Sequence, residues 1–122
     1  MKKLFLIQIL VIGLLTHSVV HSQTTLAAGD IAIVAYAMDN PDEISFLCLR
    51  SIESGTVIYF TDNGWKSDNT WRTGEGVHTW TAGQFYSTGD IVNITLSGPQ
   101  LSGGGDQIIA FQGSGTTDNS AT

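Results

Sequence analysis

Cysteine is almost absent from this sequence, and that shortage already limits how the chain can be held together. Cys48 is the only cysteine among 122 residues, so no disulfide can form within the chain and the fold must rest on packing. It lies in the apolar stretch 44–49, which predicts a buried thiol acting as a small hydrophobic group. No histidine or lysine adjoins it in sequence, so a reactive thiol is the less favoured alternative.

Long apolar runs are missing too, apart from residues 4–15. Lys2 and Lys3 precede this run and the more polar residues 16–23 follow it, which is the order of a secretory signal peptide. Residues 1–22 are therefore predicted to be a signal helix that is removed before Gln23, and the protein is predicted to be secreted or held at the cell surface. A membrane span needs about 20 residues, so a retained anchor is the alternative, and no span is expected after residue 22.

Basic residues are scarce in the predicted exported chain. Residues 23–122 contain three basic residues (Arg50, Lys66 and Arg72) and eleven acidic ones, a formal charge of −8. Such a chain offers little to the phosphates of nucleic acid, which excludes nucleic acid as a predicted partner. Cations are better matched to this charge. Apolar residues make up 42% of the sequence, too many for an intrinsically disordered chain.

Helical periodicity is lacking after residue 22, and short strand-like segments alternate with turns instead. The clearest strand is residues 56–61, in which every residue is β-branched or aromatic. Asn63-Gly64 after it predicts a tight hairpin turn, and Trp65 is expected to fold back as a lid on the core. Further strands are predicted at residues 30–37, 44–49, 77–81, 90–96 and 107–112. Short strands at near-regular spacing predict an antiparallel sandwich or barrel.

Gly-Asp pairs stand directly before three of these strands, at Gly29-Asp30, Gly89-Asp90 and Gly105-Asp106. Glycine allows a sharp entry to the strand and the carboxylate can accept backbone N–H groups there, so the pairs are interpreted as structural punctuation. Six strands fall short of the usual seven of a sandwich, and residues 114–122 are almost wholly polar. The module at 23–113 is therefore predicted to be truncated at its C-terminal side; a polar linker to another domain is the alternative.

The polar segment 62–76 is the first candidate site. Asp62, Asn63, Asp68 and Asn69 carry the hard oxygen ligands that calcium prefers, with Glu75 close behind. Their spacing does not match the EF-hand loop. An ordinary solvated loop with Asx turns is the competing interpretation, and calcium is the one cofactor that the sequence suggests.

Aromatic residues form the second candidate site. Trp65, Trp71 and Trp80 are close in sequence, and rings on one sandwich face could stack on sugars while Arg72, Glu75 or His78 bond hydroxyl groups. The alternative is that at least two of these tryptophans belong to the core.

Support for catalysis is thin. His78 is the only histidine after residue 22, and no recognised nucleophile or metalloprotease motif occurs. A carboxylate pair such as Asp62 and Glu75 could run hydrolysis, but acidic side chains on turns are usually solvated. The protein is predicted not to be an enzyme.

Five stretches resemble a poorly characterised module of bacterial secreted proteins that is similar in style to lamin-tail-like domains of the immunoglobulin fold. They are residues 28–32, 40–46, 55–65, 72–76 and 105–113. The resemblance implies an antiparallel immunoglobulin-like β-sandwich and carries over no catalytic residues. Such modules accompany enzymes, repeats or a sorting tail in large extracellular proteins, so other domains of the same protein, or an extracellular protein or glycan, are the implied partners.

The leading prediction is thus a non-catalytic extracellular module for spacing, docking or adhesion. A carbohydrate-binding sandwich using Trp65, Trp71, Arg72, Glu75 or Trp80 is the second prediction, and a small secreted hydrolase is the third.

Overall fold

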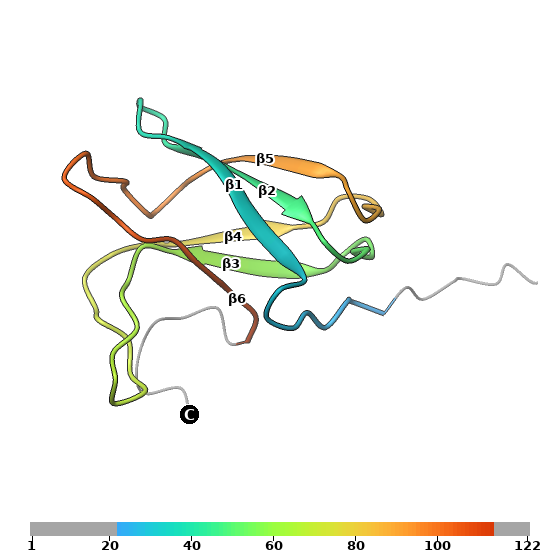
Figure 1. The fold of residues 1–122 in the computed structure, drawn as a ribbon, viewed down its shortest axis with the longest axis horizontal. Helices are drawn as coiled ribbons and strands as arrows, with labels where there is room; N and C mark the ends of the chain where they lie inside the picture. The colour runs from blue at the N-terminus through green and yellow to red at the C-terminus, as the bar shows by residue number, and fades with distance from the viewer. Residues whose placement is uncertain (1–21, 114–122) are drawn as a thin grey trace, which may run out of the picture.

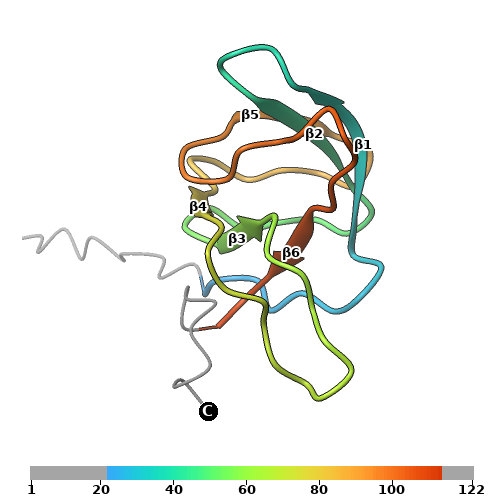
Figure 2. The same ribbon diagram turned by 90° about the vertical axis from the view of Figure 1, so that its left-hand side faces the viewer.

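The computed structural model describes residues 22–113, which form two antiparallel sheets of three strands each (Figure 1). One sheet has the order β1-β2-β5, from β1 (Ile31–Ala37), β2 (Glu43–Cys48) and β5 (Ile91–Thr95). The second sheet has the order β4-β3-β6, from β4 (Val77–Thr81), β3 (Val57–Thr61) and β6 (Ile109–Phe111). Figure 2 shows the sheets as two facing layers. The predicted all-β antiparallel sandwich is confirmed.

All six strands lie where the sequence predicts them, to within two residues at either end. Residues 22–113 contain no helix, and so none long and apolar enough to cross a membrane. Residues 1–21 of the signal helix predicted at 1–22, and the polar tail at 114–122, fall outside the described residues.

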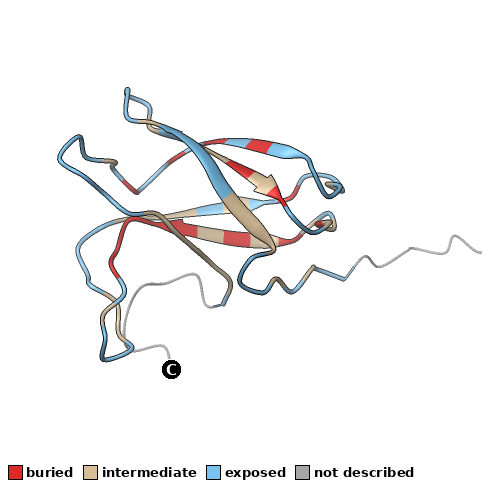
Figure 3. Ribbon diagram, viewed as in Figure 1, coloured by how far each residue is buried: buried red, intermediate tan, exposed pale blue. Residues whose placement is uncertain are grey.

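Alternating residues of the central strands build the core between the sheets, as the buried and exposed bands in Figure 3 show. Ile44, Phe46 and Cys48 of β2 are at most 1% exposed, and so are Ile58 and Phe60 of β3. The rings of Phe46 and Phe60 lie 5.7 Å apart, centroid to centroid, and join the two layers. Strand alternation therefore places one face of each sheet inside.

Cys48 has the buried position that the sequence predicts. Burial, together with the nearby Asp90 carboxylate, raises the pKa of its thiol above the ordinary value. Because the thiolate is the reactive form, Cys48 serves in the native chain as a core residue.

The Gly-Asp pairs act as the predicted turn elements. Gly29, Gly89 and Gly105 have φ angles of 93°, 98° and 108°, a region that glycine enters without steric cost. The following carboxylates each accept a backbone N–H from three or four residues earlier: Asp30 from Ala27 at 2.7 Å, Asp90 from Ser87 at 2.8 Å and Asp106 from Ser102 at 3.0 Å.

The predicted tight turn at Asn63-Gly64 is wrong. The chain reverses at residues 66–70, where the Lys66 N–H donates to the Thr70 carbonyl at 2.9 Å and the Asn69 N–H donates to Lys66 at 3.1 Å. Asn69, with φ of 61°, is the one non-glycine residue in 22–113 with positive φ. Segment 62–76 is therefore a projecting antiparallel arm, the hairpin arm, whose tip lies several residues beyond Asn63.

Candidate functional site

The base of the hairpin arm is fixed by a buried asparagine. Asn63 is 0% exposed; its Oδ1 accepts from the Glu75 N–H at 3.2 Å, and its Nδ2 donates to the Glu75 carbonyl at 3.5 Å. The Thr61 hydroxyl donates to the Gly76 carbonyl at 2.6 Å and accepts the Asn63 N–H at 3.1 Å. These bonds tie the end of β3 to the start of β4, which also explains why Asn63 is not at a solvent-exposed turn.

Four aromatic rings run from the arm onto the second sheet, and we call them the aromatic row: Trp65, Trp71, Phe111 and Tyr59. Trp65 and Trp71 face each other as cross-strand partners, with centroids 4.8 Å apart in an edge-to-face arrangement. Trp71 lies 5.2 Å from Phe111, and Phe111 lies 5.4 Å from its partner Tyr59. The row lies on the outer face of the sheet, because Tyr59 alternates with the buried Ile58 and Phe60.

Trp65 is 52% exposed at the outer end of this row, so the prediction that it is a lid on the core is wrong. Trp80 is the tryptophan that packs against the core, with its ring 5.2 Å from Phe46. The alternative that at least two tryptophans belong to the core is therefore wrong as well. The fold separates Trp80 from Trp65 and Trp71.

The polar residues predicted to accompany the tryptophans are also separated by the fold. Arg72 and Glu75 are exposed on the hairpin arm that carries Trp65 and Trp71. His78 pairs in register with Phe60 on the inner face, away from the row. Its Nδ1 accepts the Ser97 N–H at 3.0 Å, and burial lowers the pKa of its imidazole below the ordinary value.

The residues predicted to hold calcium lie at both ends of the arm. At the base, Asp62 is 4% exposed and accepts the Gln100 N–H at 2.9 Å through Oδ2; its Oδ1 has no hydrogen-bond partner in the described chain. At the tip, Asp68 accepts the Thr70 N–H at 3.1 Å and lies 3.6 Å from the Lys66 ammonium. The Thr70 hydroxyl and Lys66 lower the pKa of the Asp68 carboxyl, the hydroxyl more strongly.

Asn63 accompanies Asp62 at the base, and Asn69 adjoins Asp68 at the tip. Within residues 22–113, no three His, Cys, Asp or Glu side chains are placed to share a metal ion. Calcium binding by these four residues stays a prediction from the sequence. The carboxylates considered for hydrolysis also differ in setting, since Asp62 is buried whereas Glu75 is exposed.

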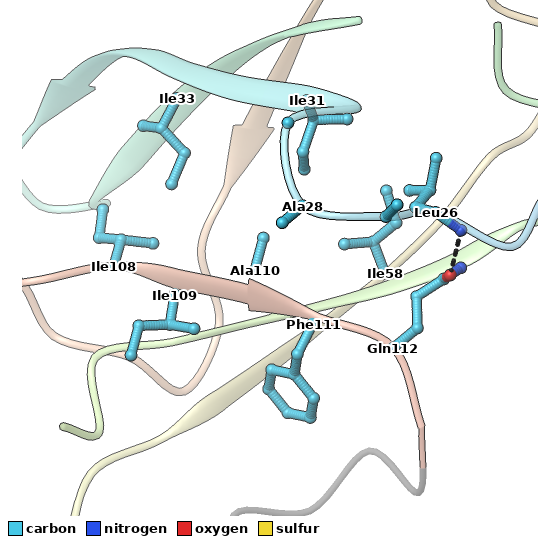
Figure 4. Close-up of a pocket in the computed structure, with 12 residues that line it drawn as sticks. Leu26, Ala28, Ile31, Ile33, Ile58, Ile108, Ile109, Ala110, Phe111 and Gln112 are labelled. Carbon is cyan, nitrogen blue, oxygen red and sulfur yellow. Dashed lines mark hydrogen bonds between the residues drawn. The ribbon is translucent and has the colours of Figure 1, made fainter. Parts of the chain in front are cut away.

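A second surface, which the sequence did not reveal, lies between the edge strands of the two sheets. This β1–β6 groove has a cavity of about 490 Å³, within the range of ligand pockets. Figure 4 shows Ile108 and Ala110 pointing into the groove, whereas Ile109 and Phe111 point away from it. The apolar walls come from Leu26, Ile31, Ile33, Ile58, Ile108 and Ala110.

The groove is closed at one end and open at the other. Gln112 closes it with three hydrogen bonds, to the Leu26 N–H at 2.8 Å (dashed in Figure 4), the Thr24 carbonyl at 3.1 Å and the Val57 carbonyl at 2.9 Å. At the other end Ile33 and Ile108 also line an adjoining cavity of about 380 Å³, which extends past Tyr36, Met38 and Asp106.

Comparison with known proteins adds no identification: the sequence matches no family model and no curated protein, and no solved structure matches the fold.

Proposed function

We propose that this chain is a non-catalytic module of an exported protein that docks on an extracellular partner through its aromatic row. The observation that carries the proposal is the position of Trp65, which is 52% exposed at the end of a continuous chain of ring contacts. The module resembles the extracellular domains named above, and that resemblance supports the export and the absence of catalysis.

The row has the properties of a binding surface. Its rings offer large contact areas with few rotatable bonds, so little conformational entropy is lost when a partner covers them. Trp71 is half-buried between Trp65 and Phe111, which fixes the platform, and tryptophan is among the residues that dominate binding energies at interfaces.

Carbohydrate is the second candidate for the partner. Arg72 and Glu75 are exposed on the arm that carries Trp65 and Trp71, so hydrogen-bonding groups lie on the same arm as an exposed ring. Trp80 takes no part in this version of the proposal, because it packs on the core side.

Site-specific crosslinking tests the docking proposal. A photoreactive phenylalanine analogue replaces Trp65 in the exported protein, and the matched control places it at Phe85, which is 50% exposed and outside the row. Irradiation of the cells that export the protein is expected to give a discrete adduct from position 65 and none from position 85. Equal adducts from both positions, or none from position 65, would contradict docking through the row.

A glycan array separates the two kinds of partner. Wild type, Trp71→Ala and Phe85→Ala are applied side by side. Loss of a sugar signal in Trp71→Ala alone supports carbohydrate binding, with an expected loss of tenfold or more in affinity, about 1.4 kcal/mol. A wild-type chain that binds no sugar while position 65 still crosslinks to a protein supports protein docking instead.

A further inference from the structure

As formed by residues 22–113, the sandwich is open along one side, where each sheet ends in a strand without an outer neighbour. The sheet orders β1-β2-β5 and β4-β3-β6 place β1 and β6 at edges, and both contribute to the β1–β6 groove. An unpaired edge presents backbone N–H and C=O groups that can pair with another strand. In residues 22–113 no strand occupies either position.

Side chains of β1 that face the interior are left uncovered on this side. Register pairs Ile33 with Phe46 and Tyr36 with Ile44, so these residues share a face with the core. Nevertheless Ile33 is 36% exposed and Tyr36 is 66% exposed, and the adjacent Met38 is 43% exposed. Within residues 22–113, therefore, no layer of side chains covers this part of the inner face of β1.

A covering layer would lie beside β6. A strand paired with the free edge of β6 would extend the second sheet and place every second side chain against the inner face of β1. Ile108 and Ala110 already point into the groove in this alternating pattern (Figure 4). Antiparallel pairing is the arrangement of all four strand pairs in the described part of the chain.

The charge of the groove walls limits which polypeptide could bind in the β1–β6 groove. Asp106 is the one charged residue along the groove walls in the described chain, and it lies before β6, at the open end. A strand antiparallel to β6 reaches Asp106 with its C-terminal part, where a lysine or arginine would be favoured. The strands that a second copy of this protein could offer do not fit, because none of the six strands in residues 22–113 contains Lys or Arg. Residues 114–122 do not fit either, because Ala121 is their only apolar residue.

We infer that the β1–β6 groove accepts an extended strand from a partner polypeptide, with apolar side chains at alternate positions and a basic residue toward its C-terminal end. The strand pairs with the free edge of β6 and covers Ile33 and Tyr36. Backbone hydrogen bonds supply affinity and the alternating side chains supply selectivity, as in other cases of strand addition. This surface is distinct from the aromatic row, so the inference holds whether or not the row docks a partner.

The first test uses synthetic peptides added to the exported chain. The probe is Val-Thr-Val-Thr-Val-Thr-Lys, which alternates and ends in lysine. One control ends in glutamate, and a second has the same composition in blocks, Val-Val-Val-Thr-Thr-Thr-Lys. The probe is expected to bind and to slow amide hydrogen exchange at residues 109–111 about tenfold. The glutamate peptide is expected to bind several-fold more weakly at low salt, and the block peptide is expected not to bind.

A matched pair of variants tests the location. Ile33→Asp places a charge in the groove, whereas Ile91→Asp places one on β5, at the other edge of the same sheet, where Ile91 is 61% exposed. Because both sites are already partly exposed, both variants are expected to fold, which circular dichroism and melting curves verify. Ile33→Asp is expected to weaken probe binding by tenfold or more, and Ile91→Asp is expected to leave it within twofold of wild type.

Four results would overturn the inference. The first is probe binding without slower exchange in residues 109–111, and the second is equal probe affinity in the two variants. The third is protection of β6 that rises with protein concentration in the absence of peptide, which would make a second copy the occupant. The fourth is uptake of a fatty acid by a chain that binds no probe, which would make the groove a lipid site.

Discussion

Asn63 joins the arm to the sheet through its side chain, and this role gives the first prediction at the scale of single residues. Asn63→Ala removes the acceptor of the Glu75 N–H and the donor to the Glu75 carbonyl. Because the position is 0% exposed, water cannot easily replace these partners, and we expect a loss of about 1–3 kcal/mol in the free energy of unfolding. Urea denaturation measures it.

The control for this substitution is Asn93→Ala, in β5, where the asparagine is exposed. A change within about 0.5 kcal/mol is expected there. Comparable losses at both positions would show that Asn63 has no special structural role.

His78 gives a prediction on pH. Burial lowers the pKa of its imidazole below 6.5, the value for an unperturbed histidine, so the unfolded chain takes up a proton at a higher pH than the folded chain does. Linkage then makes the free energy of unfolding fall as the pH is lowered below about 7 and recover above it. The Ser97 N–H donates to Nδ1, an acceptor role that the protonated ring cannot keep.

Melting temperatures measured between about pH 5.5 and pH 7.5 check this prediction. Wild type is expected to lose stability toward the acid end. His78→Gln, which cannot titrate, is expected to show a flatter profile over the same interval. Identical slopes for the two proteins would assign the pH dependence to other groups.

At the scale of elements, the six strands were predictable from the sequence because their β-branched and apolar residues alternate between plain turn signals. The Gly-Asp entries were predictable for a local reason too, since each carboxylate bonds within four residues of itself. What failed was the turn at Asn63-Gly64, where a tertiary contact with Glu75 overrode the local preference of the dipeptide. The aromatic row was also hidden, because Phe111 is far in sequence from Trp65 and Trp71.

The close approach of the connection before β4 to the connection after β5 gives a prediction at the scale of elements. A Cβ added to Gly76 would overlap the backbone of Gly98, whereas a Cβ on Gly83 would meet nothing within 4 Å. Gly76→Ala must therefore shift one connection, at a cost of about 1–3 kcal/mol in the free energy of unfolding. Gly83→Ala is expected to be neutral or slightly stabilising, by up to about 1 kcal/mol. Thermal unfolding of both variants decides; equal stabilities would contradict the close approach.

At the scale of the whole molecule, the β1–β6 groove could not be predicted from the sequence. The open side of the sandwich depends on the order of strands in each sheet, and the sequence does not specify that order. The apolar residues of β1 predicted a strand, but not that Ile33 and Tyr36 would face an interior left uncovered. Within the β4-β3-β6 sheet, inner-face side chains such as Ile58 and Ala110 line the groove, whereas outer-face rings such as Tyr59 belong to the aromatic row.

Both surfaces nevertheless share β6. Ala110 faces the groove while Phe111, the next residue, points away from it (Figure 4). The ring of Phe111 lies 5.2 Å from that of Trp71, centroid to centroid. A strand bound at the edge of β6 would restrict the motion of the β6 backbone and of the Phe111 ring beside Trp71. A ligand that then bound the aromatic row would lose less conformational entropy of the protein on binding. The effect must be mutual: each ligand would tighten the binding of the other by the same factor. Through the three residues of β6, binding at one surface would then strengthen binding at the other.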